Sequence, residues 1–186
     1  RYEQLKKSFD GKSYREYQRK KYEFFNKILE PASIKVIQAS NDDRKQLLDF
    51  FKHYKIKNIA QNRVDCYLSH NFTVIAKNKE KIVGTLQWYV KENPNAGVVE
   101  FEEIYVLENY RGKGIGSSMV KQAIQSVKSY FSKIKIRPRK IFLFVGKDNK
   151  AARDLYEKYG IKPIAELNDL FSNKSVELFY CLDLNN

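Results

Sequence analysis

The spacing of apolar and polar residues divides the chain into alternating short strands and helices. Strands are predicted at 34–38, 72–77, 81–91, 98–107, 141–145, 166–170 and 176–182. Helices are predicted from Asn41 or Asp42 to about 54, over 57–70, at 117–131, and from Asp148 or Asn149 to Tyr159. Turns at 78–80 and 93–97 join the strands on either side of them. This order predicts an α+β fold built around one mixed sheet.

The first 30 residues follow a different pattern. They are charged and aromatic, and their apolar positions recur at irregular helical spacing. Gly11 predicts a break between two helices, and Pro31 predicts their end. We therefore expect a helical N-terminal extension over 1–31 and a single domain over 32–186.

The distribution of charge along the chain indicates which kinds of ligand the protein binds. The 186 residues carry a net charge of +13, but the charge is uneven. Residues 98–110 contain four acids and no Lys or Arg, whereas residues 111–140 contain nine basic residues and no acid. An acidic strand followed by a basic helix is typical of a site for two ligands of opposite charge, and it does not indicate a nucleic-acid surface.

Other features exclude further classes of protein. No apolar stretch approaches the ~20 residues that a membrane span requires. Cys66 and Cys181 are far apart and, like His53 and His70, form no metal-binding spacing, so we expect no metal. The charged N-terminal stretch lacks the apolar core of a signal peptide. We expect a cytoplasmic protein that binds neither membrane nor nucleic acid.

The segment 111–116, Arg-Gly-Lys-Gly-Ile-Gly, lies between a predicted strand and a predicted helix. Closely spaced glycines let the backbone approach a ligand, and the following helix adds the positive end of its dipole. Arg111 and Lys113 add positive charge. The spacing fits neither the dinucleotide-binding GxGxxG motif nor the Walker loop. The segment therefore predicts a phosphate-binding loop.

Two motifs in order resemble the GNAT acetyltransferase family. Val106 and the segment 111–116 match its pattern of Val, four spacers, Arg/Gln-Gly-x-Gly-x-Gly/Ala. Residues 144–160 match its strand followed by Asn-x-x-Ala-x-x-x-Tyr-x-x-x-Gly. The resemblance covers about 33–184. It implies a single GNAT-like domain with a central mixed, mostly antiparallel sheet flanked by helices, acetyl-CoA as cosubstrate and an amine as acceptor.

The resemblance also implies roles for individual residues. Backbone groups of Tyr105, Val106 and Leu107 would pair with the pantetheine arm. The pyrophosphate would be held by Arg111, Gly112, Lys113, Gly114, Ile115, Gly116 and Ser117. Asn149 and Ala152 of the second motif would contact the cofactor. Tyr156 would lie beside the thioester sulfur and protonate the departing thiolate, although packing in the core is the competing interpretation of this residue.

The acceptor amine must lose a proton before it attacks, and a carboxylate in the cleft is the obvious base. Glu102 and Glu103 precede the motif, as two acids do in spermidine/spermine acetyltransferases, which this strand resembles. Strand alternation predicts Glu100 and Glu102 on one face and Glu103 on the other. We expect Glu102 to be the base or substrate anchor, with Glu103 second. Alternatively, these are solvated strand acids.

The acceptor itself stays open at this stage. The acids favour a small cationic amine, polyamine-like or aminoglycoside-like. A protein N-terminus or a lysine side chain is the alternative within the same enzyme class. Outside it, an inert acyl-CoA-binding or scaffold domain is possible. A homodimer is a further expectation, because dimers are common in the family.

Overall fold

The computed structural model describes residues 16–21, 34–52, 59–69, 72–171 and 174–185. The chain divides into two compact units, Arg1–Ile34 and Lys35–Asn186. In the first unit, residues 16–21 are helical. The rest of the predicted N-terminal extension, including the break at Gly11, lies outside the described residues.

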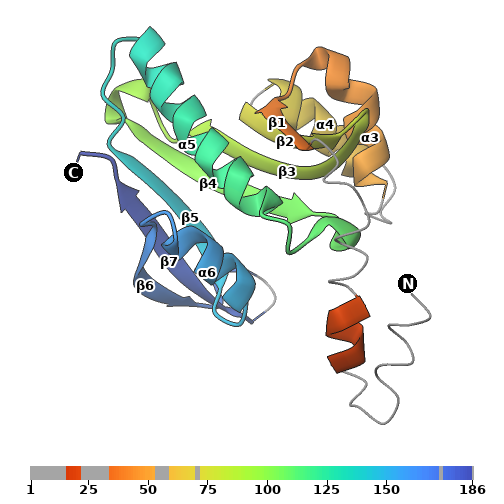
Figure 1. Cartoon of the computed structure of the whole chain (residues 1–186). Helices are drawn as coiled ribbons and strands as arrows, with labels where there is room; N and C mark the ends of the chain where they lie inside the picture. The colour runs from red at the N-terminus through yellow and green to blue at the C-terminus, as the bar shows by residue number, and fades with distance from the viewer. Residues whose placement is uncertain (1–15, 22–33, 53–58, 70–71, 172–173, 186) are drawn as a thin grey trace. The chain divides into compact units, whose positions relative to one another are not determined.

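Seven strands form one sheet in the order β1-β2-β3-β4-β5-β7-β6 (Figure 1). Their bounds are Ile34–Gln38, Phe72–Asn78, Lys81–Val90, Val98–Val106, Lys140–Gly146, Lys162–Asn168 and Val176–Asp183 for β1 to β7. The pairs β2–β3, β3–β4, β5–β7 and β6–β7 are antiparallel, and β4–β5 is parallel. The predicted mixed, mostly antiparallel sheet is confirmed.

Helices cover both faces of the sheet. The helix α5 (Ile115–Lys133) packs on β2, β3 and β4, and α6 (Lys150–Glu157) lies beside it on the same face (Figure 1). The helices α3 (Arg44–Phe51) and α4 (Ile59–Ser69) pack on β3 and β2. Trp88 faces α5, since its ring lies 5.9 Å from that of Tyr130, whereas Tyr105 faces α3, with its ring 5.9 Å from that of Phe50. The β3–β4 hairpin therefore has α5 packed on one face and α3 packed on the other.

The predicted starts of one helix and one strand lie too late in the chain. The helix α5 begins at Ile115 rather than 117, because Gly114 adopts the left-handed conformation (φ 76°) that starts the helix directly after it. The last hairpin begins earlier than predicted, since β6 spans Lys162–Asn168 instead of 166–170. This edge strand is almost wholly exposed, so it has no apolar alternation to mark it in the sequence; its pairing with β7 fixes its position.

A buried ion pair ties the start of α3 to β2. Asp43 and Lys77 are 7% and 15% exposed, and their charged atoms lie 2.5 Å apart. The Asp43 carboxylate also accepts a hydrogen bond from the Ser40 backbone N–H at 2.9 Å. Burial alone would raise the pKa of Asp43, but the hydrogen bonds and charge of Lys77 and the Ser40 N–H together hold it below its ordinary value of 3.8.

We expect Asp43→Ala to destabilise the fold by about 3 kcal/mol, because it leaves the Lys77 ammonium buried without its partner. A lowered aspartate pKa stabilises the folded state above pH 3.8 and loses that contribution as pH falls through the folded-state value. Urea unfolding at pH 7 and pH 3 checks both statements. Asp49→Ala, which removes an exposed partner of Lys52, is the matched control and should leave the midpoint nearly unchanged. Equal midpoints for the two variants would contradict the prediction.

Candidate active site

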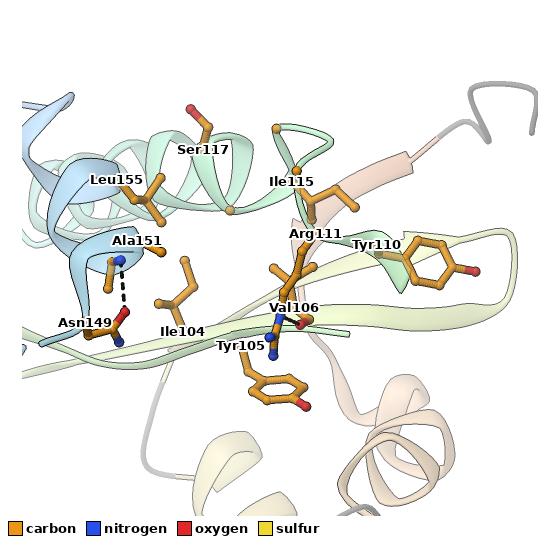
Figure 2. A pocket seen from close by; sticks show the side chains of 14 residues that line it. Ile104, Tyr105, Val106, Tyr110, Arg111, Ile115, Ser117, Asn149, Ala151 and Leu155 are labelled. Carbon is orange, nitrogen blue, oxygen red and sulfur yellow. Dashed lines mark hydrogen bonds between the residues drawn. The ribbon is translucent and has the colours of Figure 1, made fainter. Parts of the chain in front are cut away.

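The strands β4 and β5 lie together only at their starts. Residues 98–100 pair with residues 140–142, and within these two described strands no further pair follows, although β4 continues to Val106 and β5 to Gly146. A groove of about 510 Å³ opens beside the far part of β4, bounded by the starts of α5 and α6 (Figure 2). The two sequence motifs therefore meet at one place.

The first motif contributes a row of backbone donors. Within the described part of the chain, the backbone N–H groups of residues 112–117 have no acceptor. The N–H groups on either side, of Arg111 and Ser118, donate to the carbonyls of Glu108 and Gly114 at 3.1 and 3.0 Å. The α5 dipole adds positive potential at this end of a 19-residue helix. This loop is built to bind an anionic group such as a diphosphate.

The edge of β4 supplies further hydrogen-bonding groups. The Leu107 N–H donates to the Val83 carbonyl at 2.9 Å, which makes Tyr105 and Leu107 the residues bonded to β3. Ile104 and Val106 therefore direct their backbone groups away from β3, toward the groove. The Arg111 side chain donates from Nε to the Val106 carbonyl at 2.9 Å, and its guanidinium lies 5.5 Å from the Tyr105 ring centre. Arg111 is thus held at the groove by the strand itself.

The second motif closes the groove from α6. The Asn149 side chain caps this helix by accepting from the Ala152 N–H at 3.2 Å. Ile104 and Leu155 point toward one another across the groove, whereas Tyr105 points to the other side of the strand (Figure 2). A Cβ added at Gly116 would lie 3.2 Å from Leu155, so glycine at this position lets α5 and α6 approach closely. These contacts give the groove an apolar middle between polar ends.

The structure places most predicted cofactor residues along this groove. Its lining includes Tyr105, Val106, Arg111, Gly112, Gly114, Ile115, Gly116, Ser117, Asn149 and Ala152. Leu107 lines a separate cavity beside Phe50, and Lys113 lies over the Tyr110 ring instead of in the groove. Sequence reasoning missed Ile104, Tyr110, Ala151 and Leu155. For Leu155 a signal existed, since it follows Ala151 and Ala152 at helical spacing.

Tyr156 lies next to the groove residue Leu155 but is not part of the lining. Its side chain is only 2% exposed, and within the described chain its hydroxyl has no hydrogen-bond partner. That hydroxyl is not among the fully enclosed polar atoms, so it reaches an accessible edge. Burial raises the pKa of Tyr156 above its ordinary value of 10. The phenol is therefore protonated at neutral pH, as a proton donor must be.

The acids of β4 share one face, which corrects the predicted alternation. Leu86 pairs with Ile104 and Trp88 with Phe101, so β4 holds one extra residue opposite Gln87. Two residues of β4, Glu102 and Glu103, therefore oppose one residue of β3 in a β-bulge. Glu103 contacts α4, and Glu102 follows Phe101, which faces α5, so Glu102 also turns toward the α3/α4 face. Glu100, which bonds Tyr89, lies on that same face.

Each of the outer two acids has a basic partner from another part of the chain. Arg63 of α4 pairs with Glu103, which also accepts from the Tyr67 hydroxyl at 3.3 Å. Lys91 lies 3.4 Å from Glu100. The segment 98–110 contains no basic residue, but the fold brings Arg63 and Lys91 against its acids. Glu102 lies between these two pairs and is the exposed acid of the three.

Two tyrosines complete this acidic face. Burial and the Glu103 charge raise the pKa of Tyr67 above its ordinary value of 10. Burial and the hydrogen bond to Glu100 raise the pKa of Tyr89 in the same direction. The charge of Glu102 raises the pKa of both tyrosines, so its carboxylate lies near both of them. Both hydroxyls therefore stay protonated at neutral pH and donate to the carboxylates.

The model of the Acetyltransferase (GNAT) family matches residues 37–161. The chain belongs to the GNAT acetyltransferase family. The two sequence motifs that predicted this membership are the two that bound the groove.

Individual relatives agree with that assignment. The spermine/spermidine N(1)-acetyltransferase of Bacillus subtilis is 25% identical over an alignment of 146 positions, and it matches 73% of this chain and 92% of that protein. An uncharacterized N-acetyltransferase of Methanocaldococcus jannaschii is 36% identical over 66 residues, 35% of this chain; the chain spans about a quarter, 26%, of that relative's length. A Salmonella typhimurium protein described as an acetyltransferase, solved with its cofactor acetyl-CoA, has a TM-score of 0.66 at 15% identity and covers 82% of this chain and 94% of its own.

Metal-binding groups and membrane-spanning helices were sought among the residues that the structure describes. In that part of this GNAT protein, no group of His, Cys, Asp or Glu side chains is arranged to hold a metal ion. Nor does any helix described there have the length and apolar character needed to cross a bilayer.

Proposed function

We propose that this GNAT protein transfers an acetyl group from acetyl-CoA to the primary amine of a small cationic acceptor. The donor half rests on the loop 112–117, whose six backbone N–H groups match the demands of a pyrophosphate. The backbone groups of Ile104 and the Val106 N–H, which point away from β3, suit the amides of the pantetheine arm. The S. typhimurium protein of the same fold binds acetyl-CoA.

The acceptor half rests on one observation, the gathering of three carboxylates on the α3/α4 face by the β4 bulge. Glu100 and Glu103 are already paired with Lys91 and Arg63, which shows that this face accommodates cations. An ammonium group of the acceptor would add to that set beside Glu102. Attraction between these charges raises the local concentration of a cationic substrate. The spermine/spermidine relative from B. subtilis supports the same acceptor class.

The chemistry requires few groups from the protein. Acetyl-CoA supplies an activated thioester, so amine attack needs no enzyme nucleophile. Glu102 would take the first proton from the ammonium, and the nitrogen then forms its bond to the acetyl carbon as the carbon–sulfur bond breaks. Tyr156 would give its proton to the departing sulfur. The amide nitrogen loses a second proton, which balances the one that the tyrosine has given up.

An acceptor screen tests the proposal. We expect acetyl-CoA to raise the melting temperature of the full chain, and release of free thiol to be fastest with polyamines or aminoglycosides. Amino acids and peptides with free N-termini or lysine side chains are the comparison set. Faster thiol release with a peptide would identify a protein, and not a small amine, as the acceptor. A raised melting temperature without turnover of any amine would identify an inert acyl-CoA-binding domain. An unchanged melting temperature at high acetyl-CoA concentration would contradict the proposal that acetyl-CoA is the donor.

A further inference from the structure

A buried carboxylate near the start of β7 has no positively charged partner. Glu177 is only 7% exposed. It accepts a hydrogen bond from the Ser175 hydroxyl, and among the described residues no Lys or Arg forms an ion pair with it. Lys147, which follows β5, pairs instead with Glu166 at 2.8 Å. Burying a carboxylate without a cation costs free energy, so a cationic group brought by a ligand would stabilise this position.

Glu177 lies on the face of the sheet that α6 does not cover. Another β7 residue, Tyr180, faces α6, because its hydroxyl donates to that helix at 2.7 Å. Glu177 and Phe179 are separated from Tyr180 by odd numbers of positions, so both point to the opposite face. On β5, Gly146 pairs with Glu177 and Phe144 pairs with Phe179, so these two residues lie on that opposite face as well.

Phenylalanine rings form a patch on the same face. The ring centres of Phe142, Phe144 and Phe179 lie 5.3–6.0 Å from one another, and all three side chains are partly exposed. Phe171 approaches Phe144 edge-on at 6.3 Å. No described Lys or Arg lies over these rings. Faces of aromatic rings attract alkylammonium groups, most strongly where the cation is removed from water.

The glycine at the end of β5 brings the carboxylate and the rings together. A Cβ added at Gly146 would lie 3.7 Å from Oε2 and 3.9 Å from Oε1 of Glu177. The carboxylate therefore reaches over β5, and glycine leaves room beside it. The next β5 residue on this face is Phe144, about 7 Å away along the strand. A negative charge and aromatic faces thus adjoin one position, a combination that binds alkylammonium groups.

The phenylalanine patch continues to the acids of β4. Glu100 pairs with Phe142 in the last pair before β4 and β5 part, so these two residues share a face. Gly146 lies four residues beyond Phe142, which is about 13 Å along β5. Glu177 and Glu100 are also two strands apart, which is about 10 Å across the sheet. The backbone positions of the two acids are therefore roughly 16 Å apart, with phenylalanines between them.

We infer that Glu177, with the Phe144 and Phe179 rings, forms a second cation subsite that takes the far ammonium group of an aliphatic polyamine acceptor. The inference rests on the proposed function, since the near amine reacts beside the β4 acids. The phenylalanines between the acids suit methylene groups, which need no hydrogen bonds. The subsite therefore selects long polyamines over short diamines. It also disfavours aminoglycosides, whose hydroxyl groups would be buried against the phenylalanines.

The test compares a long and a short amine on the full chain. Glu177→Gln keeps the shape and an acceptor for Ser175 but removes the charge. The KM for spermidine should rise at least about tenfold with little change in kcat, whereas the KM for the short diamine putrescine should stay unchanged. Phe179→Leu, which keeps an apolar side chain and removes the ring, should raise the KM for spermidine about threefold.

Glu166→Gln is the matched control. Glu166 is an exposed acid of the same hairpin, but it pairs with Leu178 and so lies on the α6 face. Equal ratios of the two KM values in Glu177→Gln and Glu166→Gln overturn the inference. Loss of an unpaired buried charge should leave the melting temperature without ligand unchanged or raised, whereas a purely structural role of Glu177 would lower it and leave the KM ratio unaltered.

Calorimetry of spermidine binding to the full chain gives a readout that needs no turnover. Weaker binding to Glu177→Gln than to Glu166→Gln supports the subsite, even where the acceptor screen selects a peptide and so contradicts the proposed function. Equal binding to the two variants overturns the inference. A changed oligomeric state of Glu177→Gln with unchanged spermidine affinity also overturns it, because the cation beside Glu177 would then belong to a second copy of the chain.

Discussion

Replacing Tyr156 with phenylalanine should lower turnover by about 10²–10⁴-fold, the usual contribution of a general acid, and leave acetyl-CoA affinity nearly unchanged. The substitution keeps the ring that fills a nearly closed site and removes only the hydroxyl, which bonds to no described residue. Stability should therefore change little. Single-turnover kinetics, with acetyl-CoA binding measured by calorimetry, separates the chemical step from binding.

The pH profile adds a second test of the same residue. Burial raises the pKa of Tyr156, so its protonated form persists at least up to the ordinary tyrosine value of 10. Tyr156 should therefore cause no fall in kcat below that pH. Tyr130→Phe is the control, because its ring packs between α5 and the β2–β3 surface and its hydroxyl has no assigned role. If Tyr156→Phe turns over as fast as Tyr130→Phe, another group protonates the thiolate.

Gly116→Leu should weaken acetyl-CoA binding by at least about 100-fold, because it fills the part of the groove that leads away from the loop. Even a Cβ at this position meets Leu155 at 3.2 Å and Ile104 at 3.8 Å. A leucine side chain must therefore extend into the groove or force α6 away, and overpacking of this kind costs about 1–3 kcal/mol. The measurement is the loss of the acetyl-CoA-induced rise in melting temperature.

The control for this variant is Ser118→Leu. Ser118 lies two residues further along α5 and is exposed, so the same added side chain points to solvent. Its melting temperature should still rise with acetyl-CoA. If acetyl-CoA raises the melting temperature of both variants fully, the groove beside Gly116 is not the cofactor site. If Gly116→Leu without ligand has the melting temperature of the parent protein, any loss of binding is a local effect of the substitution.

The sequence alone determined the glycine loop and the helix cap that bound the groove. Glycines at 112, 114 and 116 and the Asn149 cap act through their own backbone or their nearest neighbours, and such short-range effects are readable from local spacing. The apolar periodicity of α5 and the hairpin of β2 and β3 were likewise evident. The loop therefore lies where the motif predicted, with the groove residues Arg111 and Ser117 beside it.

The arrangement of the acidic face was decided by the tertiary structure. Which face Glu103 occupies depends on one extra residue in β4, and only the pairing of β4 with β3 reveals that bulge. The same holds for the Arg63 and Lys91 charges, which reach Glu103 and Glu100 from α4 and from the residue that follows β3. Alternation is a local rule, but register, burial and charge pairing arise between segments far apart in the chain. The sequence therefore identified the GNAT family, and the fold arranged the acids that we propose face the acceptor amine.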